Sequence, residues 1–230
     1  MEVKGSRPTP RRRVRMNVAI AMGAPKGDLD SLALDGARFC VEMALRSFGG
    51  PPAGFWVFQQ KPVRVPVPGV EDMGRWVDEW FAKGDPVDNL RGERKSNAAE
   101  RLVKKNKAFG PAGFALAPTL KAIIEATGEL TGHTLAVVML TSSPDDGAAI
   151  IATLKRAARY PVFWVFIGAN WDHERVLHLG ALDTLGERPG DPENVLILKT
   201  RGWGSEFGDW WRTRRIRKAS ARWRRRVPLG

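Results

Sequence analysis

The sequence predicts a doubly wound α/β domain, with a mostly parallel sheet and helices on both of its faces. Short apolar runs that suit buried strands alternate along the chain with longer stretches of helical periodicity. Strands that are apolar on both sides need helices on both faces of the sheet, which is typical of parallel sheets. At 230 residues, 43% of them hydrophobic, the chain is long enough for one domain with a substantial core.

The expected elements follow one another from residue 14 onward. The strands are apolar runs bounded by glycine, proline or polar residues, at 14–22, 54–60, 135–141, 161–168 and 194–199. The helices lie at 28–48, 70–83, 114–127, 145–159, 172–179 and from 206 onward. The segment 63–68 alternates but carries two prolines, which place it at an edge of the sheet or outside it.

The net charge of +12 is concentrated at the two ends of the chain. Residues 1–15 carry +5 and residues 199–230 carry +9, whereas residues 16–198 carry −2. We therefore expect a basic N-terminal arm over 1–13 and an arginine-rich C-terminal tail over 214–230, on either side of a nearly neutral body.

The body, residues 14–213, contains a polar and basic insertion at 84–113, in which 97–108 suits an exposed amphipathic helix. The single cysteine, Cys40, cannot form an internal disulfide and fits a reducing cytoplasm. It lies on the apolar face of its helix, which indicates a buried, inert thiol. No apolar run is long enough to span a bilayer.

The loops that follow the strands are where an open parallel sheet binds its ligands. Here these loops are 23–27, 110–114 and 141–147. None of them carries the G-x-G-x-x-G or G-x-x-x-x-G-K-[ST] pattern of a nucleotide site. No serine stands in a G-x-S-x-G elbow either. The residues therefore offer no constellation for enzyme chemistry.

Several short segments, taken in order, resemble a known family over roughly residues 14–216. They are the strand-loop-helix opening, Ala117-Pro118-Thr119-Leu120 entering a helix, the strand 137–141 (VVMLT), the strand 161–168 (PVFWVFIG) and the segment 206–210 (EFGDW). In this order they resemble the von Willebrand factor A (vWA) domains of bacterial tellurium-resistance (Ter-type) proteins. The resemblance implies a doubly wound sheet with a metal site at the strand ends.

Such domains typically hold a divalent cation through a D-x-S-x-S loop, a threonine and an aspartate, because Mg²⁺ prefers oxygen ligands. The resemblance places Gly23, Pro25 and Gly27 at the loop positions, Phe114 at the threonine and Ser142 at the aspartate. Only Ser142 offers an oxygen ligand. We therefore expect a degenerate metal-binding (MIDAS) motif and no metal or other cofactor.

Two carboxylates near the end of the third long strand, Asp145 and Asp146, permit two interpretations. Paired carboxylates can hold a cation, which makes them weak candidates for a displaced metal site. An N-terminal helix cap that also favours the helix dipole explains them more simply, and we prefer it.

Basic residues form two candidate binding groups. The partner-binding candidates in the loops and the insertion are Lys26, Arg94, Lys95, Lys104 and Lys105. The polyanion-binding candidates near the C-terminus are Arg212, Arg214, Arg215, Arg217, Lys218, Arg222, Trp223, Arg224, Arg225 and Arg226. We interpret Trp210 and Trp211 as docking the last helix on the sheet. Trp223 stands alone among arginines, and we expect its indole to be free to stack on a base or to enter a lipid headgroup layer.

These observations favour a non-enzymatic vWA-like interaction or scaffold module whose metal site is lost. The resemblance implies a cytoplasmic bacterial or phage assembly of the tellurite- or stress-resistance type, with other proteins of that assembly as partners. A protein that binds nucleic acid or another acidic surface through its C-terminal tail is the first alternative. A metal-dependent hydrolase or nuclease that uses Asp145 and Asp146 is the second.

Overall fold

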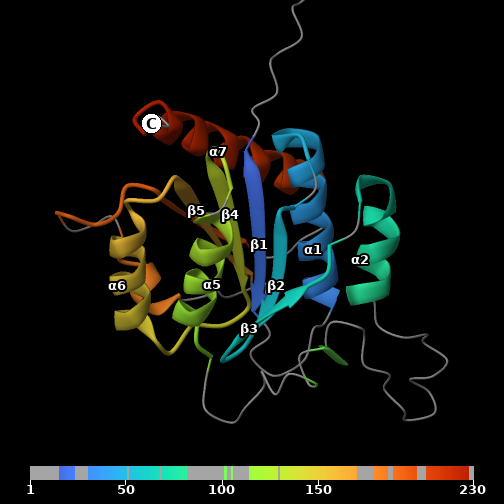
Figure 1. The fold of residues 1–230 in the computed structure, drawn as a ribbon, viewed down its shortest axis with the longest axis horizontal. Helices are drawn as coiled ribbons and strands as arrows, with labels where there is room; N and C mark the ends of the chain where they lie inside the picture. The colour runs from blue at the N-terminus through green and yellow to red at the C-terminus, as the bar shows by residue number, and fades with distance from the viewer. Residues whose placement is uncertain are drawn as a thin grey trace, which may run out of the picture.

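A computed structural model shows one six-stranded sheet with helices on both faces (Figure 1). It describes residues 16–23, 31–50, 52–67, 69–81, 101–102, 105, 114–128, 130–169, 179–185, 189–200 and 206–227. The strands are β1 (Asn17–Gly23), β2 (Gly54–Phe58), β3 (Pro62–Val65), β4 (Thr134–Leu140), β5 (Val162–Ala169) and β6 (Val195–Thr200). The α-helices are α1 (Ser31–Met43), α2 (Met73–Phe81), α5 (Ala117–Gly128), α6 (Gly147–Ala157) and α7 (Glu206–Arg224).

The strands lie in the order β3-β2-β1-β4-β5-β6. All neighbours are parallel except β3, which pairs antiparallel with β2 at the edge of the sheet. The doubly wound α/β class is therefore confirmed, and so is the edge position of the proline-containing segment. The order reverses between β1 and β4, which makes their carboxyl ends the switch point of the sheet.

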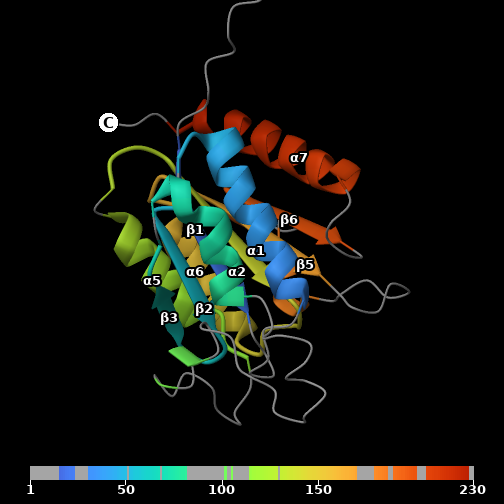
Figure 2. The same cartoon turned by 90° about the vertical axis from the view of Figure 1, so that its right-hand side faces the viewer.

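Two apolar layers enclose the sheet. On one face, α1, α2 and α7 bury a cluster that includes Phe48, Trp76, Ile216 and Trp223. On the other face, α5 and α6 bury a second cluster around Trp164. Figure 2 looks onto the face of the sheet that α1 and α2 cover, with α5 and α6 behind the sheet. Because β1 and β4 lie between the two layers, almost every residue of both strands is buried, as their continuous apolar sequences require.

Short helical turns complete the chain between these elements. A π-helical turn, Ala44–Phe48, extends α1 and ends where Gly49 adopts a φ of 91°. A 3-10 turn, Val70–Asp72, leads into α2, and another, Gly180–Leu182, precedes β6. The expected helix over 172–179 falls almost wholly outside the described residues. Of the insertion, residues 101, 102 and 105 are helical and the others lie outside the described residues.

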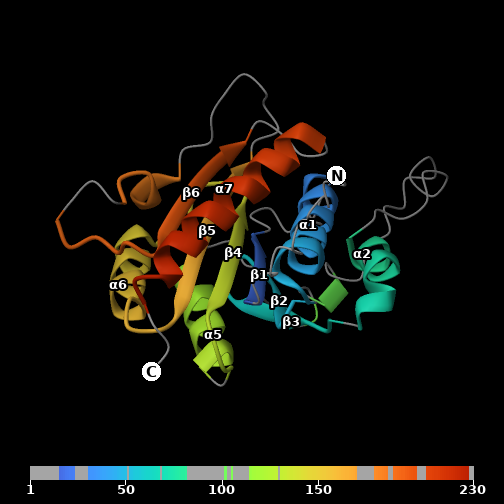
Figure 3. The ribbon, with the colours of Figure 1, turned by 90° about the horizontal axis from the view of Figure 1, so that it is seen from above.

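The last helix contradicts the expectation of a separate tail beginning at 214. α7 is continuous across the expected boundary at 213 and lies over β5 and β6 (Figure 3). Its apolar residues Ile216, Ala219, Trp223 and the following Val227 recur at helical spacing and pack into the core. Residues 214–227 are therefore part of the folded domain.

Within the described part of the chain, no helix is both long enough and apolar enough to cross a membrane.

Candidate functional site

The candidate site lies at the switch point, where β1 ends at Gly23 and β4 ends at Leu140. The segment 114–116, which leads into α5, closes over these strand ends. Its middle residue is tied to the end of β2, because the Ala115 N–H donates to the Gln59 carbonyl at 2.7 Å. The structure thus brings Gly23, Phe114 and Ser142 to the same edge of the sheet, as the sequence resemblance predicts.

Phe114 fills the space in which a side chain at position 23 would project. A Cβ at Gly23 would lie 2.4 Å from Cζ and 2.9 Å from Cε2 of the Phe114 ring. The ring is only 4% exposed and stacks on Phe58, with ring centroids 5.2 Å apart and an interplanar angle of 12°. Backbone and aromatic carbon therefore occupy the place at which a carboxylate ligand would begin.

The divalent cation that the resemblance implies does not fit these residues. Gly23 has no side chain, and the Phe114 ring presents only carbon. Ser142 is half-buried, two residues beyond the end of β4, and contributes a single hydroxyl. Among the described residues, no group of three or more His, Cys, Asp or Glu side chains is placed to hold a metal ion.

Asp145 and Asp146 bind backbone N–H groups of the segment that leads into α5. Asp145 Oδ2 accepts from the Phe114 N–H at 2.7 Å, and the Asp145 N–H donates to the Phe114 carbonyl at 2.8 Å. The Asp146 carboxylate accepts from the N–H groups of Leu116 at 2.9 Å and Ala117 at 2.7 Å. Both side chains thereby hold the Phe114 segment in place.

The predicted helix cap is therefore present, but the carboxylates do not cap α6, the helix that follows them in the sequence. Asp146 occupies the N-cap position of α6, yet its side chain makes no capping hydrogen bond to that helix. It caps α5 instead, where free N–H groups and the positive end of the helix dipole favour a carboxylate.

The loop candidates Pro25, Lys26 and Gly27 lie outside the described residues, as do Arg94, Lys95 and Lys104 of the insertion. Lys105 is exposed in a helical position.

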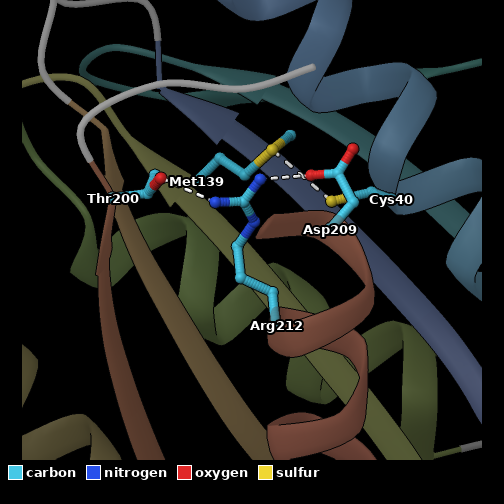
Figure 4. Close-up of polar contacts among 5 residues, drawn as sticks. All are labelled: Cys40, Met139, Thr200, Asp209 and Arg212. Atoms are coloured by element: carbon cyan, nitrogen blue, oxygen red, sulfur yellow. Dashed lines mark hydrogen bonds and ion pairs between the residues drawn. The ribbon is translucent and has the colours of Figure 1, made fainter. Parts of the chain in front are cut away.

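A buried polar cluster joins α1, β4, β6 and the start of α7 (Figure 4). Arg212, 6% exposed, is ion-paired with Asp209 and donates to Thr200 Oγ1 at 2.7 Å. Cys40 Sγ lies 3.4 Å from Met139 Sδ. Burial, and secondarily the charge of Asp209, raises the pKa of the Cys40 thiol, whereas Arg212 acts in the opposite direction. The expected buried Cys40 is confirmed.

The polyanion candidates divide into buried and exposed groups. Arg212 belongs to the buried cluster, so its expected role on the surface is wrong. The indole of Trp223 is 7% exposed and packs against His133 and Phe163, with ring centroids at 5.2 and 5.5 Å. The expectation of a free indole at Trp223 is therefore also wrong.

The two tryptophans at the start of α7 were expected to be buried against the sheet, and this expectation is wrong. Trp210 is 55% exposed and Trp211 is 41% exposed, so these residues do not dock the helix on the sheet. The spacing of Ile216, Ala219 and Trp223 was the sequence signal that could have assigned the buried face correctly.

Comparison of the sequence with protein-family models and with curated proteins gives no match. Among solved structures, the chain is similar to the conserved hypothetical protein BatB from Bacteroides thetaiotaomicron, with a TM-score of 0.52, 11% identity, and coverage of 90% of this chain and 99% of that one. At this identity the likeness concerns the fold. What the two proteins share is the doubly wound α/β architecture.

Two structures of proximal thread matrix protein 1 from the mussel byssus are also similar, each at 12% identity and covering 90% of this chain. Their TM-scores are 0.47 and, for the form with a zinc-occupied MIDAS motif, 0.46. This chain spans 48% of the mussel protein in both.

Proposed function

We propose that this chain is a non-enzymatic interaction module of vWA-like fold whose strand-end site works without a metal ion. The observation that carries the proposal is the Phe114 ring, which covers Gly23 where a metal ligand would project. An aromatic ring that is buried against Phe58 makes this edge of the sheet a rigid, shaped surface. Partners would then recognise its shape and its exposed polar groups.

The loop after β4 supplies exposed groups beside that ring. Ser143 and Asp145 are exposed, and Asp145 is held by its two hydrogen bonds to Phe114. A surface that is already ordered loses little conformational entropy on binding, which favours protein recognition. On the strength of the sequence resemblance, we place the module in a bacterial or phage stress-resistance assembly of the Ter type.

The metal-dependent hydrolase has less support. Three of the backbone N–H groups at the start of α5 donate to the carboxylates of Asp145 and Asp146. A cation at these carboxylates would compete with those hydrogen bonds, and the segment carrying Phe114 would lose its attachment.

A reconstruction experiment tests the loss of the metal. The wild-type chain and a variant carrying Gly23→Asp, Pro25→Ser, Gly27→Ser, Phe114→Thr and Ser142→Asp are melted with Mg²⁺, with Mn²⁺ and with EDTA. We expect the melting temperature of the wild type to be unchanged by these additions. A folded variant should gain a metal-dependent rise, because a ligand that binds only the folded state stabilises it. A saturable rise in the wild type would contradict the proposal.

Partner capture tests the interaction itself. The tagged full chain is used to capture proteins from the source cell, with chelator in one arm and nuclease in another. We expect a defined set of proteins to persist in both arms. Replacing Ser143 and Asp145 by arginine should release them, whereas Lys121→Glu with Arg156→Glu, on the outer surfaces of α5 and α6, should not. Complete loss in the chelator arm, or an unaltered set with the first variant, would contradict a metal-independent site at this loop.

A further inference from the structure

The outer face of α7 is a basic and aromatic surface that the proposed strand-end site does not use. The helix turns its apolar residues toward the sheet, so the opposite face is left to solvent. Six exposed cations lie on that face or in the turn that directly follows it: Arg214, Arg215, Arg217, Lys218, Arg222 and Arg225. At 1.5 Å per residue, the stretch from Arg214 to Arg225 is about 17 Å long. We refer to these six residues with Trp210 and Trp211 as the α7 outer face.

The two exposed tryptophans are joined to this row of cations. The Arg214 guanidinium lies over the Trp210 ring at 5.3 Å, and the Arg215 guanidinium lies over the Trp211 ring at 4.7 Å. Both pairs are four residues apart, so the helix itself holds each cation against its ring. The start of the face therefore presents stacked planar groups rather than flexible side chains.

The charge of this face is not neutralised within the described part of the chain. None of the six cations forms an ion pair with a described carboxylate, whereas the neighbouring Arg226 pairs with Glu193 at 3.0 Å. Like charges held on one helix face repel one another, and a bound polyanion would relieve that repulsion.

A groove runs beside the same residues. A hollow of about 410 Å³ lies between the π-helical turn Ala44–Phe48 and α7, and its lining includes the buried Phe48 together with Trp210, Arg214, Arg217 and Lys218. A larger hollow of about 700 Å³ continues from it along α1 and shares Trp210, Thr213 and Arg217, but its lining also includes the carboxylates of Asp35, Glu42 and Asp209. In the smaller hollow the exposed Trp210 ring lies beside three cations, which suits a flat ring whose attached phosphate reaches those cations.

We propose that the α7 outer face binds single-stranded nucleic acid. The phosphates pair with the six cations, and unpaired bases stack on the Trp210 and Trp211 platforms and enter the smaller hollow beside Trp210. Stacking needs bases that are not already paired in a duplex. A second copy of the chain does not suit this face, because its own α7 would place an identical row of cations against this one. An anionic membrane would attract the charges, but the apolar stripe of α7 that could insert into lipid is buried against the sheet.

The test measures the anisotropy of labelled oligodeoxythymidylate on the full chain across a salt series. The oligonucleotide has about 20 nucleotides, which exceeds the length of the face at roughly 3.4 Å per nucleotide. The α7 variant carries Arg214→Glu, Lys218→Glu and Arg225→Glu. Its charge-matched control carries Lys61→Glu, Lys121→Glu and Arg156→Glu, all exposed and away from α7. Circular dichroism melting confirms that both variants are folded.

We expect the α7 variant to lose at least about tenfold in affinity, and its salt slope to fall by about 2, because three phosphate contacts are removed. The control should lose much less. Trp211→Ala should lose about tenfold with an unchanged slope, since it removes stacking and no charge.

Four outcomes would overturn the proposal. Equal losses in the α7 variant and the control would show that only net charge matters. Retained binding in the α7 variant, with loss on replacing Arg11, Arg12 and Arg13 by glutamate, would assign binding to the N-terminal arm. A membrane would be the target if vesicles of phosphatidylcholine and phosphatidylserine bind the chain as tightly as the oligonucleotide does. Trp211→Ala would then weaken vesicle binding and leave oligonucleotide binding unchanged. Absence of binding at low salt would also overturn it.

Discussion

The Phe114 ring lies so close to Gly23 that a Cβ at position 23 would sit 2.4 Å from its Cζ atom. The ring is 4% exposed and stacks on Phe58, so it has no open space to move into. This contact fixes the segment that precedes α5 against the end of β1. It also places carbon where the sequence resemblance expects the first metal ligand.

Gly23→Ala should therefore destabilise the fold. Overpacking of a closed site costs about 1–3 kcal/mol, because neighbouring side chains and backbone must shift. Urea denaturation measures the loss. Gly74→Ala is the matched control, since a Cβ at position 74 meets nothing within 4 Å and position 74 lies inside α2. There alanine should stabilise by up to about 1 kcal/mol, because it is the better helix former.

The smaller side chain of Phe114→Leu should relieve part of the cost of Gly23→Ala. A double-mutant cycle of the two substitutions should then show a favourable coupling of about 0.5 kcal/mol or more. Strictly additive effects would mean that the Phe114 ring does not limit the size of the side chain at position 23, and the description of this contact would be wrong.

The positions of the buried strands along the chain were largely predictable from the sequence, because buried parallel strands need continuous apolar runs. The edge position of β3 was predictable for another reason, because the segment 63–68 carries two prolines, which lack the N–H that a strand paired on both sides must donate. The orientation of α7 was misread. Its many arginines obscured a narrow apolar stripe at Ile216, Ala219 and Trp223, which is enough to bury one side of a helix.

The candidate site was predictable only in part. The meeting of Gly23, Phe114 and Ser142 follows from the sequence resemblance, whereas nothing local in the sequence shows that the Phe114 ring covers Gly23. The hydrogen bonds from Leu116 and Ala117 to Asp146 join residues that are about 30 positions apart in two different loops. Such contacts depend on how the finished sheet places its loops, so they carry no signal in local spacing.

Asp146→Ala should loosen the start of α5. The carboxylate accepts hydrogen bonds from two N–H groups that have no partner within the helix, and loss of a cap costs about 0.5–2 kcal/mol. Asp146→Asn keeps one acceptor oxygen and should fall between the wild type and alanine. Urea denaturation gives the order. Glu125→Ala, an exposed change on the same helix, is the control, and equal losses at the two positions would refute the cap.

Cys40 should make the stability depend on pH in the alkaline range. Burial raises its pKa in the folded state, whereas an unfolded cysteine ionises near pH 8.5. Above about pH 8.5 the unfolded chain binds fewer protons than the folded chain, so the free energy of unfolding falls by up to about 1.4 kcal/mol per pH unit. Below that pH the stabilisation is fully present.

Other groups also titrate at high pH, so the measurement is a difference. The free energy of unfolding of the wild type and of Cys40→Ala is measured from about pH 7 to pH 10. We expect the alanine variant to be less stable at neutral pH but to lose stability less steeply between about pH 8.5 and 10. Parallel curves for the two proteins would show that the thiol ionises in the folded state, contrary to its burial.

Trp223 is buried beneath α7 whereas Trp211 is exposed, so the two should respond differently to the same substitution. Trp223 packs against Phe163 and His133 in the core, so Trp223→Ala should cost about 3–5 kcal/mol. Trp211 is 41% exposed and contacts Arg215, so Trp211→Ala should cost less than about 1 kcal/mol. Chemical denaturation of both variants measures the contrast. Deleting residues 214–230 would remove Ile216 as well as Trp223 from the core and should unfold the domain, so a stable truncated protein would show that α7 is dispensable.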